Sequence, residues 1–192
     1  MAAPRADLLV LVKHARPDVD PARPSDEWTL GVDGLEGSLR LAERLRPAGI
    51  GLVVSSTEPK SVETSRLVAQ TLDIDWQTGH DLHEHRRRTA GYLDEPLFEA
   101  SIRRLFIEPA TVVFGEESAD AAAARFEIGL ESLRRVYRGR RMAIVAHGTV
   151  ISLHLERRYG LDGFSTWKRL GTPSFVVVDR RSRTVLEVVA SV

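Results

Sequence analysis

The most regular feature of the chain is a set of short aliphatic runs separated by longer mixed segments. Three of them, 7–12, 50–56 and 142–147, are continuous and rich in branched residues. Such runs are typical of strands covered on both faces in a parallel sheet. Two more runs, 174–179 and 184–190, are joined by the short turn RRSR and predict a closing antiparallel pair. The pattern therefore predicts five strands.

Between these runs, apolar residues recur at helical spacing. The leucines of 35–45 indicate one helix, which the segment PAG closes, and Pro59 is tolerated in the first turn of the next. The expected helices cover 35–45, 58–72, 97–106, 118–137 and the segment from Gly148 that Gly160 ends. The remainder of 73–117 is predicted to be loops. Strands alternating with helices predict an α/β fold, a three-layer sandwich with a mainly parallel central sheet flanked by helices, as a single domain over 1–192.

Composition narrows the class of protein and of partner. A chain of 192 residues with 43% hydrophobic and 28% charged residues is typical of a soluble globular protein with one core. The 27 basic and 27 acidic residues balance, so we expect neither a nucleic acid nor a membrane as partner. The absence of cysteine excludes disulfides, thiolate nucleophiles and cysteine-ligated metals. The N-terminal MAAPRAD lacks the basic-then-apolar pattern of a signal peptide, so we expect a cytoplasmic location.

Polar and titratable residues gather where three of the predicted strands end. The first strand runs into KHAR (13–16), the second into SST (55–57) and the third into HGT (147–149). Ligands of α/β sheets bind beyond the carboxyl ends of the strands, so we expect these segments to meet in one site. Lys60 lies in the first turn of a helix, where the helix dipole disfavours a cation, and this favours a bound anion nearby. The free N–H groups at the helix start after His147 suit phosphate oxygens.

Together these segments resemble the motifs of the histidine phosphatase superfamily, the phosphoglycerate mutase-like proteins. VKHARP resembles the Arg-His-Gly triplet after the family's first strand, and SSTEPKSVET resembles its serine, arginine and threonine segment. DLHEH, GEES and IVAHGTVI resemble the proton-donor segment, the Gly-Glu-Ser segment and the second histidine motif, in that order. The resemblance implies that His14 is the phosphorylated nucleophile, Glu84 the proton donor and His147 the second histidine. It implies no metal and no cofactor.

The resemblance also assigns phosphate-binding residues, with departures from the family pattern. Lys13 and Lys60 stand where the family has arginines, and Ala15 stands where it has glycine. Only three of the 27 basic residues are lysine, so finding two of them here favours a matched substitution that keeps both positive charges over decay of the site. The backbone at Gly148 and Thr149, which starts the helix after the second histidine, is expected to complete the phosphate-binding set.

The implied mechanism places specific demands on the residues. Neutral His14 attacks phosphorus through one ring nitrogen, while a backbone carbonyl holds the other. Lys13, Lys60 and His147 stabilise the charge of the transition state. Glu84 protonates the departing oxygen and then activates the water that hydrolyses the phosphohistidine. Because Glu84 must first be protonated, we expect its pKa to be raised in the closed site.

Arginines near the site leave alternatives open. Arg16, two residues past the nucleophile, either adds a guanidinium to the phosphate-binding set or is solvated in its loop. In the segment GHDLHEHRRR, His85 and Arg86 are candidates to face the substrate, whereas Arg87 and Arg88 are interpreted as a solvated charge run. The alternative interpretation of these arginines is that they select an acidic substrate.

The middle segment also raises a metal hypothesis and two fallback acids. His80, His83 and His85 invite comparison with a zinc site. No helix is predicted there to place two histidines on one face, and cysteine ligands are absent, so loop histidines are favoured over a metal site. Glu116 and Glu117 of the GEES segment are the fallback proton donors.

Three functions remain open from the sequence. The first, a phosphomonoester phosphatase acting on a small metabolite or a phosphoprotein, is favoured because the family's mutases tend to be longer than this chain. The second is a phosphoglycerate mutase-type transfer, which needs a bisphosphate primer. The third is a non-catalytic phosphate-binding homologue, in which the lysines bind but His14 does not turn over. The segment 165–170 and the last strand are candidates for a homodimer interface.

Overall fold

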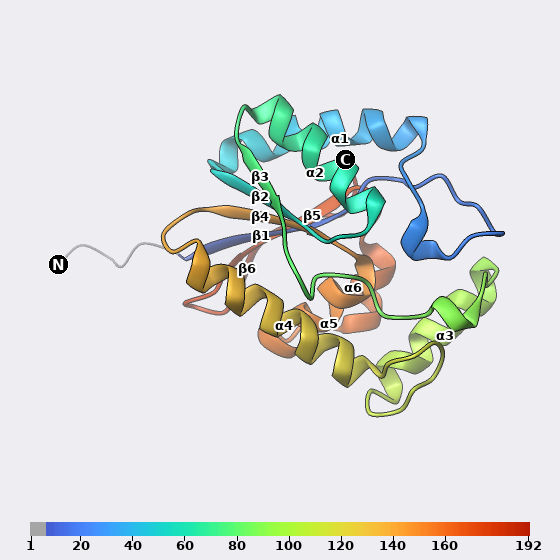
Figure 1. Ribbon diagram of the computed structural model, residues 1–192. Coiled ribbons are helices and arrows are strands. Elements are labelled where there is room, and N and C mark those ends of the chain that lie inside the picture. The colour runs from blue at the N-terminus through green and yellow to red at the C-terminus, as the bar shows by residue number, and fades with distance from the viewer. Residues whose placement is uncertain (1–6) are drawn as a thin grey trace.

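The structure, a computed structural model, describes residues 7–192 and is an α/β sandwich of three layers (Figure 1). Within these residues the central sheet has six strands in the order β3-β2-β4-β1-β5-β6. The strands are β1 (Leu8–Lys13), β2 (Leu52–Ser55), β3 (Asp75–Thr78), β4 (Met142–Ala146), β5 (Ser174–Asp179) and β6 (Thr184–Val189). The pairs from β3 to β1 are parallel, and β5 and β6 close the sheet as antiparallel strands. The predicted fold class is confirmed.

Helices cover both faces of the sheet (Figure 1). α1 and α2 lie over one face, and α4 and α5 lie over the other. The helices are α1 (Val32–Leu45), α2 (Pro59–Leu72), α3 (Glu95–Ile107), α4 (Ala119–Val136), α5 (Gly148–Tyr159) and α6 (Gly163–Arg169). Three short 3₁₀ turns are also present in the described part of the chain: η1 (Ser25–Glu27), η2 (Arg46–Ala48) and η3 (Arg88–Ala90). No helix between residues 7 and 192 is long and apolar enough to cross a membrane.

The aliphatic run of β1 is continuous because the strand is buried on both faces. Leu9 and Leu11 belong to the core under α4 and α5, whereas Val10 and Val12 belong to the core under α1 and α2. This alternation follows the two-residue period of a strand. Burying such a side chain fully is worth about 2 kcal/mol, so the central strand anchors both layers.

Two elements differ from the sequence prediction. β3 was missed because it is an edge strand with the polar, mostly exposed sequence DWQT, which leaves no apolar pattern. α6 was missed because it is short; its start is fixed by the Asp162 carboxylate, which accepts a hydrogen bond from the Ser165 N–H at 2.7 Å. Most of the segment 165–170 is therefore helical. It packs on α3 within the chain, with 5.6 Å between the ring centroids of Trp167 and Phe98.

The strand order brings the three polar strand ends together, as the sequence predicts. β4 lies between β2 and β1, with Lys13 paired to Ala146 and Ser55 paired to Val145. The segments 13–16, 55–57 and 147–149 therefore leave the same edge of the sheet. The N-terminal MAAPRA, on which the expectation about a signal peptide rests, lies outside the described residues.

α1 packs directly against the backbone that follows β1. The Arg16 carbonyl accepts a hydrogen bond from the Gly31 N–H at 3.2 Å. A Cβ atom added at Gly34 would lie 2.1 Å from the same carbonyl oxygen, which is closer than any real contact. Gly34 is therefore required for this close approach, which fixes the loop after β1.

We predict that Gly34→Ala lowers the free energy of unfolding by about 1–3 kcal/mol, because backbone atoms must move to admit the methyl group. Urea unfolding followed by circular dichroism measures this. Gly51→Ala is the matched control, since no atom lies within 4 Å of its added Cβ, and its effect should stay within about 0.5 kcal/mol. Equal unfolding midpoints for the two variants would contradict the packing described for Gly34.

Candidate active site

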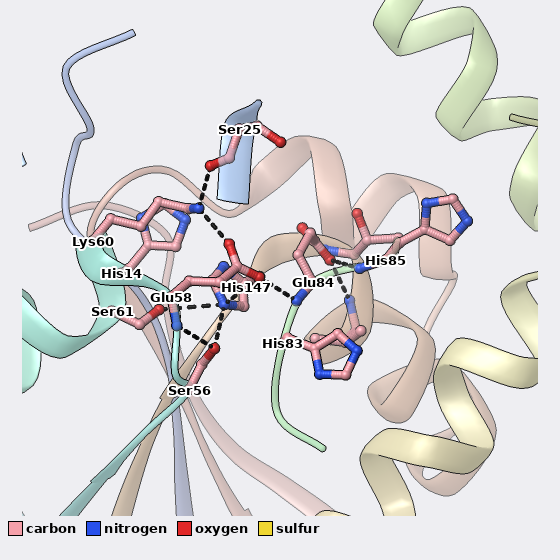
Figure 2. Close-up of polar contacts among 12 residues, drawn as sticks. His14, Ser25, Ser56, Glu58, Lys60, Ser61, His83, Glu84, His85 and His147 are labelled. Carbon is pink, nitrogen blue, oxygen red and sulfur yellow. Dashed lines mark hydrogen bonds and ion pairs between the residues drawn. The ribbon is translucent and has the colours of Figure 1, made fainter. Parts of the chain in front are cut away.

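Two histidines face each other at the carboxyl edge of the sheet. His14 follows β1 and His147 is the N-cap of α5, and their ring centroids lie 5.1 Å apart (Figure 2). Both side chains are buried, His147 completely. The sequence predicted that these two residues would meet, and the strand order explains why they do.

His14 is held in one tautomer by the backbone. Its Nδ1 lies 2.7 Å from the Ala15 carbonyl oxygen. A carbonyl only accepts, so Nδ1 carries the proton and Nε2 keeps its lone pair. Burial, followed by the neighbouring His147 and Lys60, lowers the pKa of His14 well below its usual value. His14 is therefore neutral at pH 7.

The loop after His14 is tied to α2 through one hydroxyl. The Ala15 N–H donates to Thr64 Oγ1 at 3.0 Å, and that hydroxyl donates to the Lys60 carbonyl at 2.7 Å. This relay connects the end of β1 to the helix that carries Lys60. The backbone around the predicted nucleophile is thereby held from two sides, by α1 and by α2.

The two nitrogens of His147 have different surroundings. Nε2 lies 2.9 Å from Ser56 Oγ, 3.4 Å from Ser61 Oγ and 3.3 Å from Glu58 Oε1. Nδ1 is buried and has no hydrogen-bond partner within residues 7–192. Burial, and next the charge of Lys60, lowers the pKa of His147 well below its usual value. Because the Glu58 carboxylate only accepts, Nε2 carries the proton of the neutral ring and Nδ1 keeps its lone pair.

The anion beside Lys60 is a residue of the chain itself. Lys60 Nζ donates to Glu58 Oε2 at 2.5 Å and to the Ser25 carbonyl at 2.6 Å. The sequence predicted an anion at this point, but it did not single out Glu58. The only signal was an acidic residue two positions before Lys60, which looks the same as the acidic residues found at many helix starts.

Glu84 occupies the start of α5, where phosphate was expected. Its carboxylate accepts hydrogen bonds from the N–H groups of Thr149 at 3.1 Å, Val150 at 3.3 Å and His85 at 2.9 Å. The backbone of Gly148 lies close to the Lys13 side chain: a Cβ atom added at Gly148 would be 3.2 Å from Lys13 Cε. The helix start therefore binds an anion, which in this structure is Glu84, and phosphate binding by Gly148 and Thr149 stays a prediction.

The expectation of a raised pKa for Glu84 is wrong for this structure. Burial alone would raise the pKa, but Arg87, His147 and the N–H groups of His85 and Thr149 together lower it to about 2. Arg87 NH1 lies 3.8 Å from Glu84 Oε2. Backbone donors and a neighbouring guanidinium stabilise the carboxylate more than burial destabilises it, so Glu84 is ionised at neutral pH.

Lys13 is the second cation of the site and is half-buried. Its Nζ donates to the Leu170 carbonyl at the end of α6, at 2.6 Å. Burial lowers the pKa of Lys13 to about 8, with Glu84 opposing the shift and Arg87 adding to it. Lys13 is therefore charged at pH 7 and loses its charge only one unit higher.

The arginines near the site have different surroundings. Arg16 is exposed and is not among the residues that line the cavity described below, so its role in phosphate binding stays a prediction. Arg87 is half-buried beside Glu84, and its guanidinium carbon Cζ lies 4.7 Å from the centre of the Phe98 ring. The interpretation of Arg87 as solvated is wrong, because the Phe98 ring covers it. Arg88 is exposed and pairs with Asp26 at 3.2 Å, as a surface charge does.

The remaining polar residues of the middle segment are engaged in holding its loops. His85 is buried, with Nε2 2.7 Å from the Glu117 carbonyl. Glu117 pairs with Arg125 at 2.6 Å, and the Glu116 carboxylate accepts from the N–H groups of Arg88 and Thr89. Both fallback acids therefore have structural partners. His83 accepts from Arg86, and no group of three metal-binding side chains occurs within residues 7–192.

A cavity of about 650 Å³ opens outside this network. Both Glu58 and Glu84 lie on its wall, and its rim carries a run of three arginines. The lining residues are Ser25, Asp26, Thr57, Glu58, His83, Glu84, His85, Arg86, Arg87, Arg88 and Glu116. His14 and His147 are not among the lining residues, and Glu58, which lies 3.3 Å from His147, connects the cavity wall to the histidine pair.

Comparison with known proteins agrees with the motifs. The profile of the histidine phosphatase superfamily (branch 1) matches residues 9–189. No protein of curated function matches the chain in a sequence search.

Solved structures share the fold at low sequence identity. A mycobacterial glucosyl-3-phosphoglycerate phosphatase has a TM-score of 0.77 at 19% identity, covering 98% of this chain and 100% of that one. A phosphoserine phosphatase from Entamoeba histolytica has a TM-score of 0.74 at 13% identity, covering 95% and 96%. The α-ribazole phosphatase from Shigella flexneri has a TM-score of 0.72 at 19% identity, covering 96% of each chain.

We predict that Glu84 stabilises the folded protein above about pH 4.5 and that this contribution is lost as the pH falls towards 2, because its folded pKa is lowered to about 2. Relative to Glu84→Gln, the wild type should lose about 2–3 kcal/mol of unfolding free energy between pH 5 and pH 2. Urea titrations at fixed pH measure the difference. A gap that stays constant over this range would contradict the lowered pKa.

Proposed function

The chain belongs to the histidine phosphatase superfamily, and we propose that it hydrolyses phosphomonoesters through a phosphohistidine on His14. The observation that carries the proposal is the contact of His14 Nδ1 with the Ala15 carbonyl, in a ring whose centroid lies 5.1 Å from that of the His147 ring. It leaves the Nε2 lone pair of a neutral histidine available as nucleophile. The solved neighbours named above are phosphatases, which supports hydrolysis over other chemistry.

In the proposed first step, His14 Nε2 forms a bond to phosphorus while the bond from phosphorus to the ester oxygen breaks. Lys13 and Lys60 stabilise the charge of the phosphoryl oxygens, and His147 joins them once the incoming dianion raises its pKa and Nδ1 is protonated. In the second step water attacks the phosphohistidine, which releases inorganic phosphate and restores neutral His14. Side chains supply all the positive charge, so no metal is part of the proposal.

Glu84 is the proposed proton donor, and substrate binding must first protonate it. A phosphoryl group next to Glu84 places like charge beside its carboxylate and competes for Arg87 and for the N–H groups of α5. Both effects raise a carboxyl pKa. The proton then passes from Glu84 to the departing ester oxygen, and the carboxylate afterwards takes a proton from the attacking water.

The proposed substrate class is a small phosphorylated metabolite. The cavity of about 650 Å³ suits a group of that size. The solved neighbours are named as phosphatases of glucosyl-3-phosphoglycerate, phosphoserine and α-ribazole, which supports the same class.

A second candidate function is phosphate binding without turnover. Two observations favour it: Lys60 is paired with Glu58 at 2.5 Å, and the pKa of Glu84 is lowered to about 2. A protein of this kind would bind inorganic phosphate but would form no phosphohistidine. Turnover therefore decides between the two candidates.

We predict hydrolysis of p-nitrophenyl phosphate in excess chelator, and its loss by at least about a thousandfold in His14→Ala, because the nucleophile carries the covalent step. Release of nitrophenolate measures the rate. Activity that disappears with chelator would contradict metal independence, and activity that survives in His14→Ala would contradict the nucleophile. A mutase would be identified instead by interconversion of 3-phosphoglycerate and 2-phosphoglycerate that depends on a bisphosphate primer.

We predict that kcat/KM falls as the pH rises through about 8, because Lys13 has a pKa of about 8 in the free enzyme and loses its charge there. In Lys13→Arg the fall should move at least about one pH unit higher, since arginine keeps its charge. The pH profile of p-nitrophenyl phosphate hydrolysis measures both. Lys168→Arg, which changes an exposed lysine paired with Glu99, is the control and should keep the wild-type profile.

A further inference from the structure

Glu58 lies between the groups that surround the proposed phosphoryl site. Its side chain is only 8% exposed. Oε2 lies 2.5 Å from Lys60 Nζ, and Oε1 lies 3.3 Å from His147 Nε2 and accepts from the Glu84 N–H at 2.8 Å. Figure 2 shows its carboxylate pointing between Lys60 and His147. Glu58 therefore contacts three residues of the site.

Lys60 cannot serve Glu58 and a phosphoryl group equally well. Its ammonium has three donors, of which one is used by Glu58 and one by the Ser25 carbonyl. A phosphoryl dianion bound to the third would lie beside the buried Glu58 carboxylate. Like charges at such short range in a buried site repel strongly.

We propose that Glu58 sets the affinity of the phosphoryl site: its carboxylate competes with the phosphoryl dianion for Lys60 and thereby weakens the binding of inorganic phosphate and of the phosphate ester alike. The inference rests on the proposed function, which places the phosphoryl group beside Lys60. It adds a residue that neither the sequence motifs nor the proposed chemical steps require.

The competition has its main consequence for release of the phosphate product. An ester carries an organic group that contacts the cavity wall, where Arg86 and Arg87 lie, in addition to its phosphoryl group. Inorganic phosphate has only the phosphoryl contacts. Weakening the Lys60 contact therefore leaves the ester with its cavity contacts, whereas phosphate loses a large part of its binding and dissociates.

The test is calorimetric titration of inorganic phosphate into the wild type and Glu58→Gln. Glutamine keeps the size of the side chain and can accept from the Glu84 N–H, but it carries no charge. We expect the Kd for phosphate to fall by at least about tenfold, because a like charge is removed from the buried site. The KM for p-nitrophenyl phosphate should fall in parallel.

Glu63→Gln is the matched control. Glu63 lies on the same helix, and its carboxylate also accepts from a backbone N–H, that of Leu30 at 2.7 Å. Glu63 does not line the cavity. Its substitution should change the Kd for phosphate by no more than about twofold, because Glu63 contacts the backbone of Leu30 and not Lys60.

A double-mutant cycle ties the effect to Lys60. In a Lys60→Gln background, Glu58→Gln should change the Kd for phosphate by less than about twofold, since the group competed for is gone. Glu58→Gln leaves a buried cation unpaired and is expected to unfold at lower temperature. Because phosphate is expected to bind this variant more tightly, phosphate should raise its Tm more than it raises the Tm of the wild type. The double variant, which removes both charges, provides a folded comparison.

The outcomes separate this inference from the proposed function. Equal or weaker phosphate binding by folded Glu58→Gln overturns the inference, as does tightening that persists without Lys60. A merely loosened site would weaken binding, so the direction of the change excludes a structural effect. If the wild type hydrolyses the ester but Glu58→Gln has the same Kd for phosphate as the wild type, the inference is overturned and the proposed function stands. Failure of every variant to bind phosphate or hydrolyse an ester overturns the proposed function and the inference with it.

Discussion

Charge balance in a buried site is the constraint on which the rest of this structure depends. The ends of β1, β2 and β4 bring Lys13, Lys60, His14 and His147 together away from water. Buried charges are costly unless they are paired or accept hydrogen bonds. Glu58 pairs with Lys60, the N–H groups of α5 hold Glu84, and both histidines become neutral. The resident carboxylates occupy the two places that the proposed mechanism assigns to the phosphoryl group, the lysine and the helix start, so under that mechanism substrate binding rearranges them.

The sequence predicted the elements whose pattern comes from burial. β1, β2, β4 and β5 have continuous apolar runs because both faces of each are covered, and the polar strand ends followed from the topology of such sheets. β3 could not be predicted, since an exposed edge strand needs no apolar residues. The histidine pair was predictable because each histidine directly follows a buried strand.

The errors concern side-chain direction and electrostatics, which a sequence does not contain. The low pKa of Glu84 arises from backbone N–H groups whose orientation is set by tertiary packing. Arg87 and Arg88 are neighbours in sequence, yet one lies beside Glu84 and the other pairs at the surface. The ion pair of Glu58 with Lys60 depends on how α2 begins. No compositional signal distinguishes these cases.

The most direct test of the proposed chemistry is to trap the covalent intermediate. Wild-type protein is mixed with p-nitrophenyl phosphate, quenched rapidly in alkali to preserve phosphohistidine, digested and analysed by mass spectrometry. We predict one phosphoryl group on the peptide that contains His14, lost on brief exposure to acid and absent in His14→Ala. Turnover without any such adduct, or an adduct on another residue, would contradict a phosphohistidine mechanism at His14.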